Sequence, residues 1–254
     1  MPHEYIPIEL LLDKSLPVAA RFIYAVISVV PSTSVRELCK VIGLHRDAIR
    51  QHCETLRKAG WIGMEGDRHG YVVYPKLPAE VQRRMAHDLG ERLKIVGFLG
   101  EAIMRAWLDL LLADDDFLDN FRPDFLRNPR TGEPLEYDRY HPKIRAAFEF
   151  NGSQHSRTTK KYSNPDKLDD QKTKDLVKRA ISAEQGIRLV VVEAKDLTLQ
   201  GMLAKLQGLP LRRFDPTGPY VRNLEKLSKR YIAKAEAEAE AEAVESRFAQ
   251  SEER

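Results

Sequence analysis

Glycine and proline divide the segment from Leu16 to Tyr74 into short pieces, and this division limits how it can fold. Apolar residues recur at helical spacing in the first three pieces, which end at Pro31, Gly43 and Gly60, and such residues stop helices. The last piece has two β-rich runs around a Gly/Asp turn, which is typical of a hairpin. The sequence therefore predicts helices over 16–30, 35–42 and 46–59, followed by a hairpin over 61–74.

The junction between the third helix and the hairpin reads Leu56-Arg57-Lys58-Ala59-Gly60-Trp61. The order of three helices, this junction and a hairpin resembles the winged helix-turn-helix family over roughly 16–75. The resemblance implies that the third helix binds DNA in the major groove, where side chains reach base edges. The alternative is a winged helix that contacts proteins. The candidate DNA-binding residues are His45, Arg46, Arg50 and Gln51 on the third helix, and Arg68 and His69 at the tip of the hairpin.

Two further predicted strands meet at the short turn His141-Pro142-Lys143. Side chains alternate between faces in the second strand, so Phe148 and Phe150 pack on one side and leave Glu149 on the other. Antiparallel pairing across the turn brings Asp138 of the first strand opposite Glu149. Mg²⁺ and Mn²⁺ prefer oxygen ligands, and Mg²⁺ commonly binds through one or two carboxylates. The two strands therefore predict a divalent-cation site.

The residues from Gly97 to Val192 resemble the catalytic core of the restriction-endonuclease-like superfamily, in which an Asp precedes Glu-x-Lys on the next strand. Within that superfamily they are similar to very-short-patch-repair-like nucleases and related homing endonucleases. The resemblance implies an α/β core with a mixed central sheet that hydrolyses phosphodiester bonds. The matching residues are Gly100-Glu101, Asp138, Glu149-Phe150-Asn151-Gly152, Gln154-His155, Asp175 with Lys178, and Gly186 to Val192.

The same resemblance implies a role for each matching residue. Asp138 and Glu149, together with Phe150, form the set that holds Mg²⁺ or Mn²⁺. His155 positions or deprotonates the attacking water, since a neutral imidazole can accept a proton near neutral pH. The residues expected to assist are Glu101, Asn151, Asp175 and Lys178.

Asn151 stands where the superfamily pattern has a lysine. An amide carries no charge, so either another group stabilises the phosphate or the site is inactive. The resemblance to the histidine-containing branch favours His155 for this role. Lys160 and Lys161 are alternatives, and their polar loop is also a candidate phosphate contact. The remaining alternatives are Lys174 and Lys178.

The charge distribution favours a polyanionic partner such as DNA. The chain has 41 Lys and Arg residues and 38 Asp and Glu residues. Many of the carboxylates lie in an Ala-Glu tail, so the rest of the chain is more basic than the net charge of +3 indicates.

Cys39 and Cys53 match no metal-ligand spacing and are expected to be reduced core thiols. No apolar run approaches the ~20 residues that cross a bilayer, so we expect a cytoplasmic protein.

These features together predict an α/β protein that acts as a DNA endonuclease, and a homodimer is compatible with them. The alternative function is a winged-helix transcriptional regulator or DNA-binding protein whose nuclease-like domain is inactive. A nuclease that acts on RNA or branched DNA ranks last, because no RNA-binding aromatic motif is visible. The predicted segments are a winged-helix domain over 1–77, a helical linker over 78–98, a restriction-endonuclease-like domain over 99–215 and a charged helical tail over 216–254.

Overall fold

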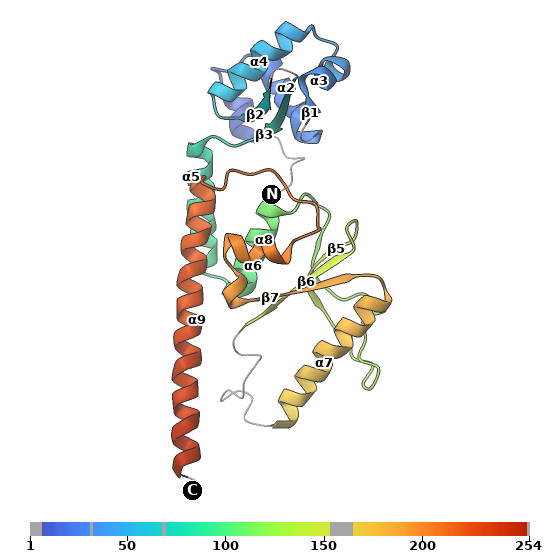
Figure 1. Cartoon of the computed structure of the whole chain (residues 1–254), viewed down its shortest axis with the longest axis vertical. Coiled ribbons are helices and arrows are strands. Elements are labelled where there is room, and N and C mark those ends of the chain that lie inside the picture. The colour runs from blue at the N-terminus through green and yellow to red at the C-terminus, as the bar shows by residue number, and fades with distance from the viewer. Residues whose placement is uncertain (1–6, 31–32, 68–69, 153–164, 253–254) are drawn as a thin grey trace. The chain divides into compact units, whose positions relative to one another are not determined.

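The computed structural model is a mixed α/β fold, as predicted, and it divides into two compact units (Figure 1). The first unit comprises the chain up to Glu91 together with Arg213–Arg222. The second comprises Arg92–Arg212 and the chain from Asn223 onward. Two helices, α5 (Ala79–Leu93) and α9 (Pro219–Glu252), each contribute residues to both units. The residues that the structure describes are 7–30, 33–67, 70–152 and 165–252.

Local signals place the helices of the first unit. The Ser34 side chain accepts a hydrogen bond from the Glu37 N–H, and the Glu37 carboxylate accepts one from the Ser34 N–H, so α3 begins with a capping box. Gly43 ends α3 with a φ of 74°, which glycine adopts without strain. The three predicted helices and the hairpin are confirmed as elements. The bounds are α1 (Ile8–Leu12), α2 (Val18–Val29), β1 (Thr33–Ser34), α3 (Val35–Ile42), α4 (Arg46–Lys58), β2 (Ile62–Asp67) and β3 (Gly70–Pro75).

The strands of the first unit form an antiparallel sheet in the order β1-β3-β2. Strand β1 was not predicted, and it pairs with β3 through Thr33 and Val73. The helices and the sheet share one apolar core, in which Ile23 of α2 and Ile49 of α4 are fully buried. This core fixes the buried face of α4 and leaves its opposite face in solvent.

The second unit contains a four-stranded mixed sheet in the order β4-β5-β6-β7. Strand β5 is antiparallel to both of its neighbours, β4 and β6, whereas β6 and β7 are parallel. Strand β4 was not predicted from the sequence. The bounds are α6 (Leu99–Leu111), β4 (Leu118–Phe121), β5 (Tyr137–His141), β6 (Ala146–Asn151), α7 (Pro165–Glu184), β7 (Arg188–Glu193), the 3₁₀ helix η3 (Ala194–Asp196) and α8 (Leu199–Lys205).

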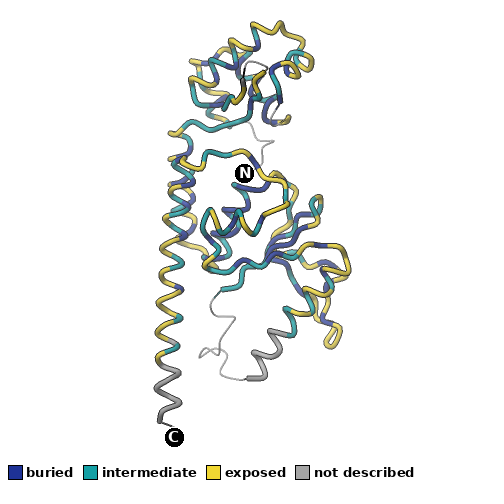
Figure 2. Tube along the Cα trace, viewed as in Figure 1, coloured by how far each residue is buried: buried dark blue, intermediate teal, exposed yellow. Residues whose placement is uncertain are grey.

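Helices α6 and α7 cover opposite faces of this sheet. A Cβ atom added at Gly100 of α6 would lie 2.2 Å from the ring of Phe150, so only glycine permits this close approach to β6. On the other face, Ile181 of α7 packs against the core around Tyr137 and Ala147. Figure 2 shows the burial concentrated on the central strands and α6, while much of α9 is exposed.

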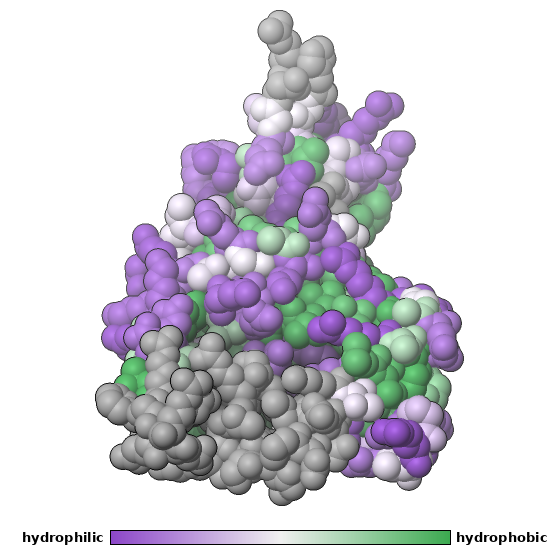
Figure 3. Space-filling view, turned by 60° about the horizontal axis from the view of Figure 1, so that its bottom comes forward, coloured by the Kyte–Doolittle hydropathy of each residue, from purple (hydrophilic) through white to green (hydrophobic). Residues whose placement is uncertain are grey.

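Hydrophilic residues occupy much of the surface drawn in Figure 3, with smaller hydrophobic areas between them. Within the described parts of the chain, no helix combines the length and the apolar character needed to cross a membrane.

Candidate active site

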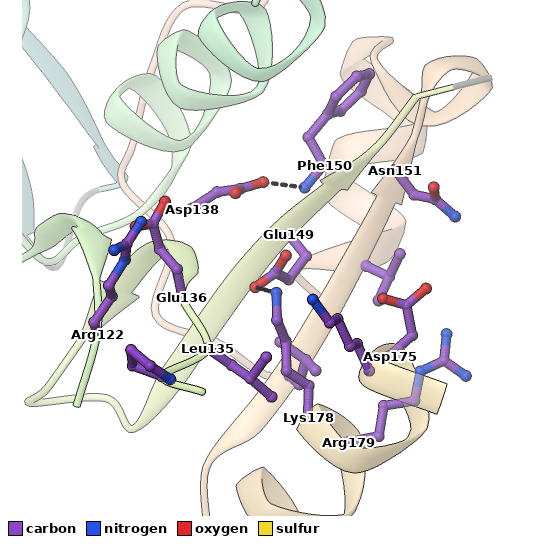
Figure 4. A pocket seen from close by; sticks show the side chains of 14 residues that line it. Arg122, Leu135, Glu136, Asp138, Glu149, Phe150, Asn151, Asp175, Lys178 and Arg179 are labelled. Carbon is purple, nitrogen blue, oxygen red and sulfur yellow. Dashed lines mark hydrogen bonds and ion pairs between the residues drawn. The ribbon is translucent and has the colours of Figure 1, made fainter. Parts of the chain in front are cut away.

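Asp138 and Glu149 lie on the neighbouring strands β5 and β6. The two strands pair from His141 with Ala146 to Arg139 with Phe148, and Asp138 and Glu149 are the next residue on each strand. The predicted antiparallel pairing of these strands is therefore confirmed. The main-chain N–H of Phe150 donates a hydrogen bond to Oδ2 of Asp138 at 2.6 Å, which fixes this carboxylate against β6 (Figure 4).

Lys178 of α7 reaches Glu149 from the face of the sheet that α7 covers. Its Nζ lies 2.7 Å from Oε1 of Glu149, and the two side chains are 16% and 17% exposed. At this distance the two groups form a close ion pair, so the ammonium of Lys178 is the partner of Oε1. Of the four lysines that the sequence offered as cations, the structure brings Lys178 to the carboxylates.

Burial makes negative charge costly at this site. Burial is the main reason that the pKa of Glu149 is raised to about 8; Lys178 opposes this shift, and the nearby carboxylate of Asp138 adds to it. Burial also raises the pKa of Asp138, and the hydrogen bond from Phe150 opposes that shift. A bound cation would relieve the cost of holding both carboxylates ionised.

The two carboxylates fit a hard divalent cation. Among the residues that the structure describes, no group of three or more His, Cys, Asp or Glu side chains converges, so Asp138 and Glu149 would be the side-chain ligands. Mg²⁺ commonly uses one or two carboxylates and keeps several waters or substrate phosphate oxygens as its other ligands. Phe150, predicted as part of the metal set, supplies the N–H that holds Asp138.

Glu101 lies near this centre and forms an ion pair with Arg105 on the same helix. Arg105 also donates a hydrogen bond of 2.8 Å to the main-chain oxygen of Asp138 and another of 2.8 Å to Asn120. Burial raises the pKa of Glu101, and the charge of Asp138 raises it further. Arg105 was not singled out in the sequence, although its i+4 spacing from Glu101 is the usual signal for such a pair.

An open cleft of about 290 Å³ contains the two carboxylates and lies between the sheet and α7 (Figure 4). Five of the residues named from the sequence line it besides Asp138 and Glu149, namely Phe150, Asn151, Lys174, Asp175 and Lys178. Sequence reasoning missed Arg122 and Glu136, whose Nε and Oε2 atoms lie 2.5 Å apart at its edge. The lining residues are Arg122, Pro134, Leu135, Glu136, Asp138, Glu149, Phe150, Asn151, Lys174, Asp175, Lys178, Arg179, Leu189 and Val191.

Five predicted residues fall outside the described part of the structure. His155 was the preferred replacement for the missing lysine, and neither its position nor those of Lys160 and Lys161 are described. The same holds for Arg68 and His69 at the predicted hairpin tip. Their roles remain predictions.

The first unit presents its candidate DNA-binding residues on α4. His45 caps this helix, and Arg46, Arg50 and Gln51 are exposed. The guanidinium carbon of Arg50 lies 5.9 Å from the ring centroid of Tyr71 on β3. The exposed face of α4 therefore carries cationic and amide groups beside the hairpin.

Comparison with known proteins yields two partial matches to viral proteins. Uncharacterized protein 033L of Invertebrate iridescent virus 3 is 39% identical over 72 residues, which are 28% of this chain and 37% of that protein. Uncharacterized protein 307L of Invertebrate iridescent virus 6 is 32% identical over 107 residues, which are 37% of this chain and 54% of that protein. The chain thus spans well under two thirds of either relative. No family model and no solved structure matches it.

Proposed function

We propose that the second unit is a metal-dependent DNA endonuclease. The observation that carries this proposal is the meeting of Asp138, Glu149 and Lys178, from β5, β6 and α7, in one open cleft. Two carboxylates and an ammonium group provide a cation site and a positive charge for a phosphate, as phosphodiester hydrolysis requires.

Each of these residues has a distinct task. Asp138 and Glu149 would hold Mg²⁺ or Mn²⁺, which when bound supplies charge stabilisation to the phosphate and lowers the pKa of a water. The N–H of Phe150 keeps Asp138 oriented toward β6. Lys178 pairs with Glu149 in the free protein and would offset charge that develops on the phosphate. His155 is assigned here to the attacking water on the family resemblance alone.

We further propose that the first unit is a winged helix that binds DNA. Its order of three helices and a hairpin supports this function, as do the exposed Arg46, Arg50 and Gln51 on α4. The basic side chains would contact phosphates or base edges in the major groove.

The alternative, a DNA-binding regulator with an inactive nuclease-like domain, depends on Asn151 in place of the usual lysine. Lys178 weakens that argument, because it supplies a cation 2.7 Å from Glu149. The two functions differ in one outcome: both bind DNA, but only the endonuclease cuts it.

Incubation of the full chain with supercoiled plasmid tests the proposal. With Mg²⁺ we expect nicked or linear product, and with excess chelator none. Glu149→Gln is expected to lose cleavage, while Asp124→Asn, which changes an exposed carboxylate outside the cleft lining, keeps it. Equal cleavage in chelator, or by the Glu149 variant, would refute the metal-dependent mechanism.

A further inference from the structure

The cleft extends beyond the two carboxylates along an apolar wall. Leu189 and Val191 of β7 line it, and Val191 lies beside Glu149 because the parallel register pairs these two residues. Both apolar side chains are only partly buried, and Pro134, which lines the cleft from the segment before β5, is exposed. A metal and a phosphate make no use of apolar surface. This wall therefore suits the carbon-rich part of a ligand.

Cationic side chains of α7 lie along the other side of the cleft. Lys174 is one helical turn before Lys178, which places their Cβ atoms about 5–6 Å apart. Its Nζ is held 3.0 Å from Oε2 of Glu133. Arg179 is exposed and also lines the cleft. An anionic group could contact Lys174 and Arg179 while Lys178 stays with Glu149.

The size of the cleft limits what can enter it. Its volume of about 290 Å³ is at the lower end of pockets that hold small ligands. One nucleotide suits this space, whereas a base pair has two bases and two sugars. In an intact duplex the bases are stacked and paired, so a whole base enters a cleft of this kind only when it is extruded at an energetic cost.

We propose that the cleft binds a single unpaired nucleotide of the DNA strand that is cut. Its phosphate contacts Lys174 and Arg179, and its sugar and base lie against Leu189 and Val191. This inference rests on the proposed nuclease function and names its substrate class, which is DNA that is single-stranded or locally unpaired at the cut. Asn151, at the end of β6, offers an amide for hydrogen bonds to the base.

Calorimetric titration of the metal-free full chain in chelator tests the nucleotide site. Thymidine 5′-monophosphate is expected to bind at least tenfold more tightly than thymidine or inorganic phosphate, since only it uses both the wall and the cations. Val191→Phe, which fills the wall, and Arg179→Ala are each expected to weaken binding at least fivefold. Arg230→Ala, an exposed arginine of α9, is the matched control and leaves binding unchanged. Circular dichroism checks that each variant is folded.

Equal affinity for phosphate and thymidine 5′-monophosphate would overturn the proposal, because the wall would then contribute nothing. So would unchanged binding by Arg179→Ala, which is a surface substitution and does not depend on repacking the sheet.

A second measurement separates this site from the nuclease function. Two labelled duplexes of one sequence, with and without a short unpaired segment, are incubated with Mg²⁺ and wild-type protein. Cleavage is expected to be at least tenfold faster within the unpaired segment, and equal cleavage of both duplexes overturns the substrate class. If neither is cut while the nucleotide binds, the nuclease function fails and the nucleotide site stands. If the nucleotide does not bind, the site fails whatever is cut.

Discussion

The metal-free wild type is expected to become less stable as pH rises, and replacing Glu149 with glutamine is expected to remove this pH dependence. The Glu149 side chain is 17% exposed, and burial raises its pKa from 4.5 to about 8. Between these two values the folded state binds more protons than the unfolded state, so stability falls as pH rises from 4.5 to about 8. The shift corresponds to on the order of 5 kcal/mol at most, and solvent in the open cleft reduces it.

Urea unfolding in chelator at several pH values from 5 to 8.5 measures this effect. The wild type is expected to lose stability relative to Glu149→Gln as pH rises, by about 1–4 kcal/mol over the range. In the variant Lys178 loses its carboxyl partner, which changes stability by a constant amount. The test is therefore the slope of the unfolding free energy against pH, and not the offset between the two proteins. Asp124→Asn, at an exposed carboxylate, is expected to follow the wild type. The reasoning would be refuted if the difference in unfolding free energy between the wild type and Glu149→Gln stayed constant across this pH range. Added Mg²⁺ is expected to stabilise the wild type selectively.

Three further predictions concern DNA. Replacing Arg46 and Arg50 with alanine is expected to weaken binding and to lower the salt slope by about one per lost phosphate contact; an unchanged slope in a filter-binding titration indicates a protein-contact role instead. Asp138→Asn is expected to abolish plasmid cleavage with equal or tighter DNA binding, because repulsion of phosphate is reduced, and wild-type cleavage contradicts this. In single-turnover assays, Lys178→Met is expected to slow cleavage about 10²- to 10³-fold, and His155→Ala to abolish it; a fully active variant removes that residue from the mechanism.

The parts of the fold that the sequence predicts are those with local causes. Helix α3 begins and ends as predicted because Ser34, Glu37 and Gly43 act within one or two turns. Strand β4 has no such signal: Leu118, Asp119 and Asn120 are all exposed, so no alternation marks a buried face. It is a strand because β5 provides a pairing edge, and that edge depends on tertiary structure.

The return of Arg213–Arg222 to the first unit also depends on distant residues. Arg213 forms an ion pair of 3.1 Å with Glu65 and lies over the ring of Tyr74, while Asp215 pairs with Lys76 at 3.2 Å. These partners are far apart in the sequence and follow no periodic pattern. Such pairs can be recognised once the chain is folded, but spacing does not predict them.

The residues of the candidate site also divide into those that local sequence signals predict and those that depend on tertiary packing. Asp138 and Glu149 could be paired in advance, since a short turn joins their strands and the pairing register follows from alternation. Lys178 could not be chosen from four lysines, because its approach depends on how α7 packs over the sheet. The apolar wall of the cleft was missed for a similar reason, since Val191 belongs to a strand that pairs with β6 in parallel after a long crossover.

The presence of Asn151 where the superfamily pattern has a lysine is therefore a weak argument against catalysis. The proposed hydrolysis requires a cation near the carboxylates, and it does not require that this cation come from the same strand. With the ammonium on α7, position 151 is free of that task and can hold a neutral amide in the cleft lining. A lysine there would add a second cation beside Lys178, in a cleft whose four basic and four acidic side chains balance. If the proposed endonuclease function holds, Lys178 supplies from the helix the positive charge that Asn151 does not supply from the strand.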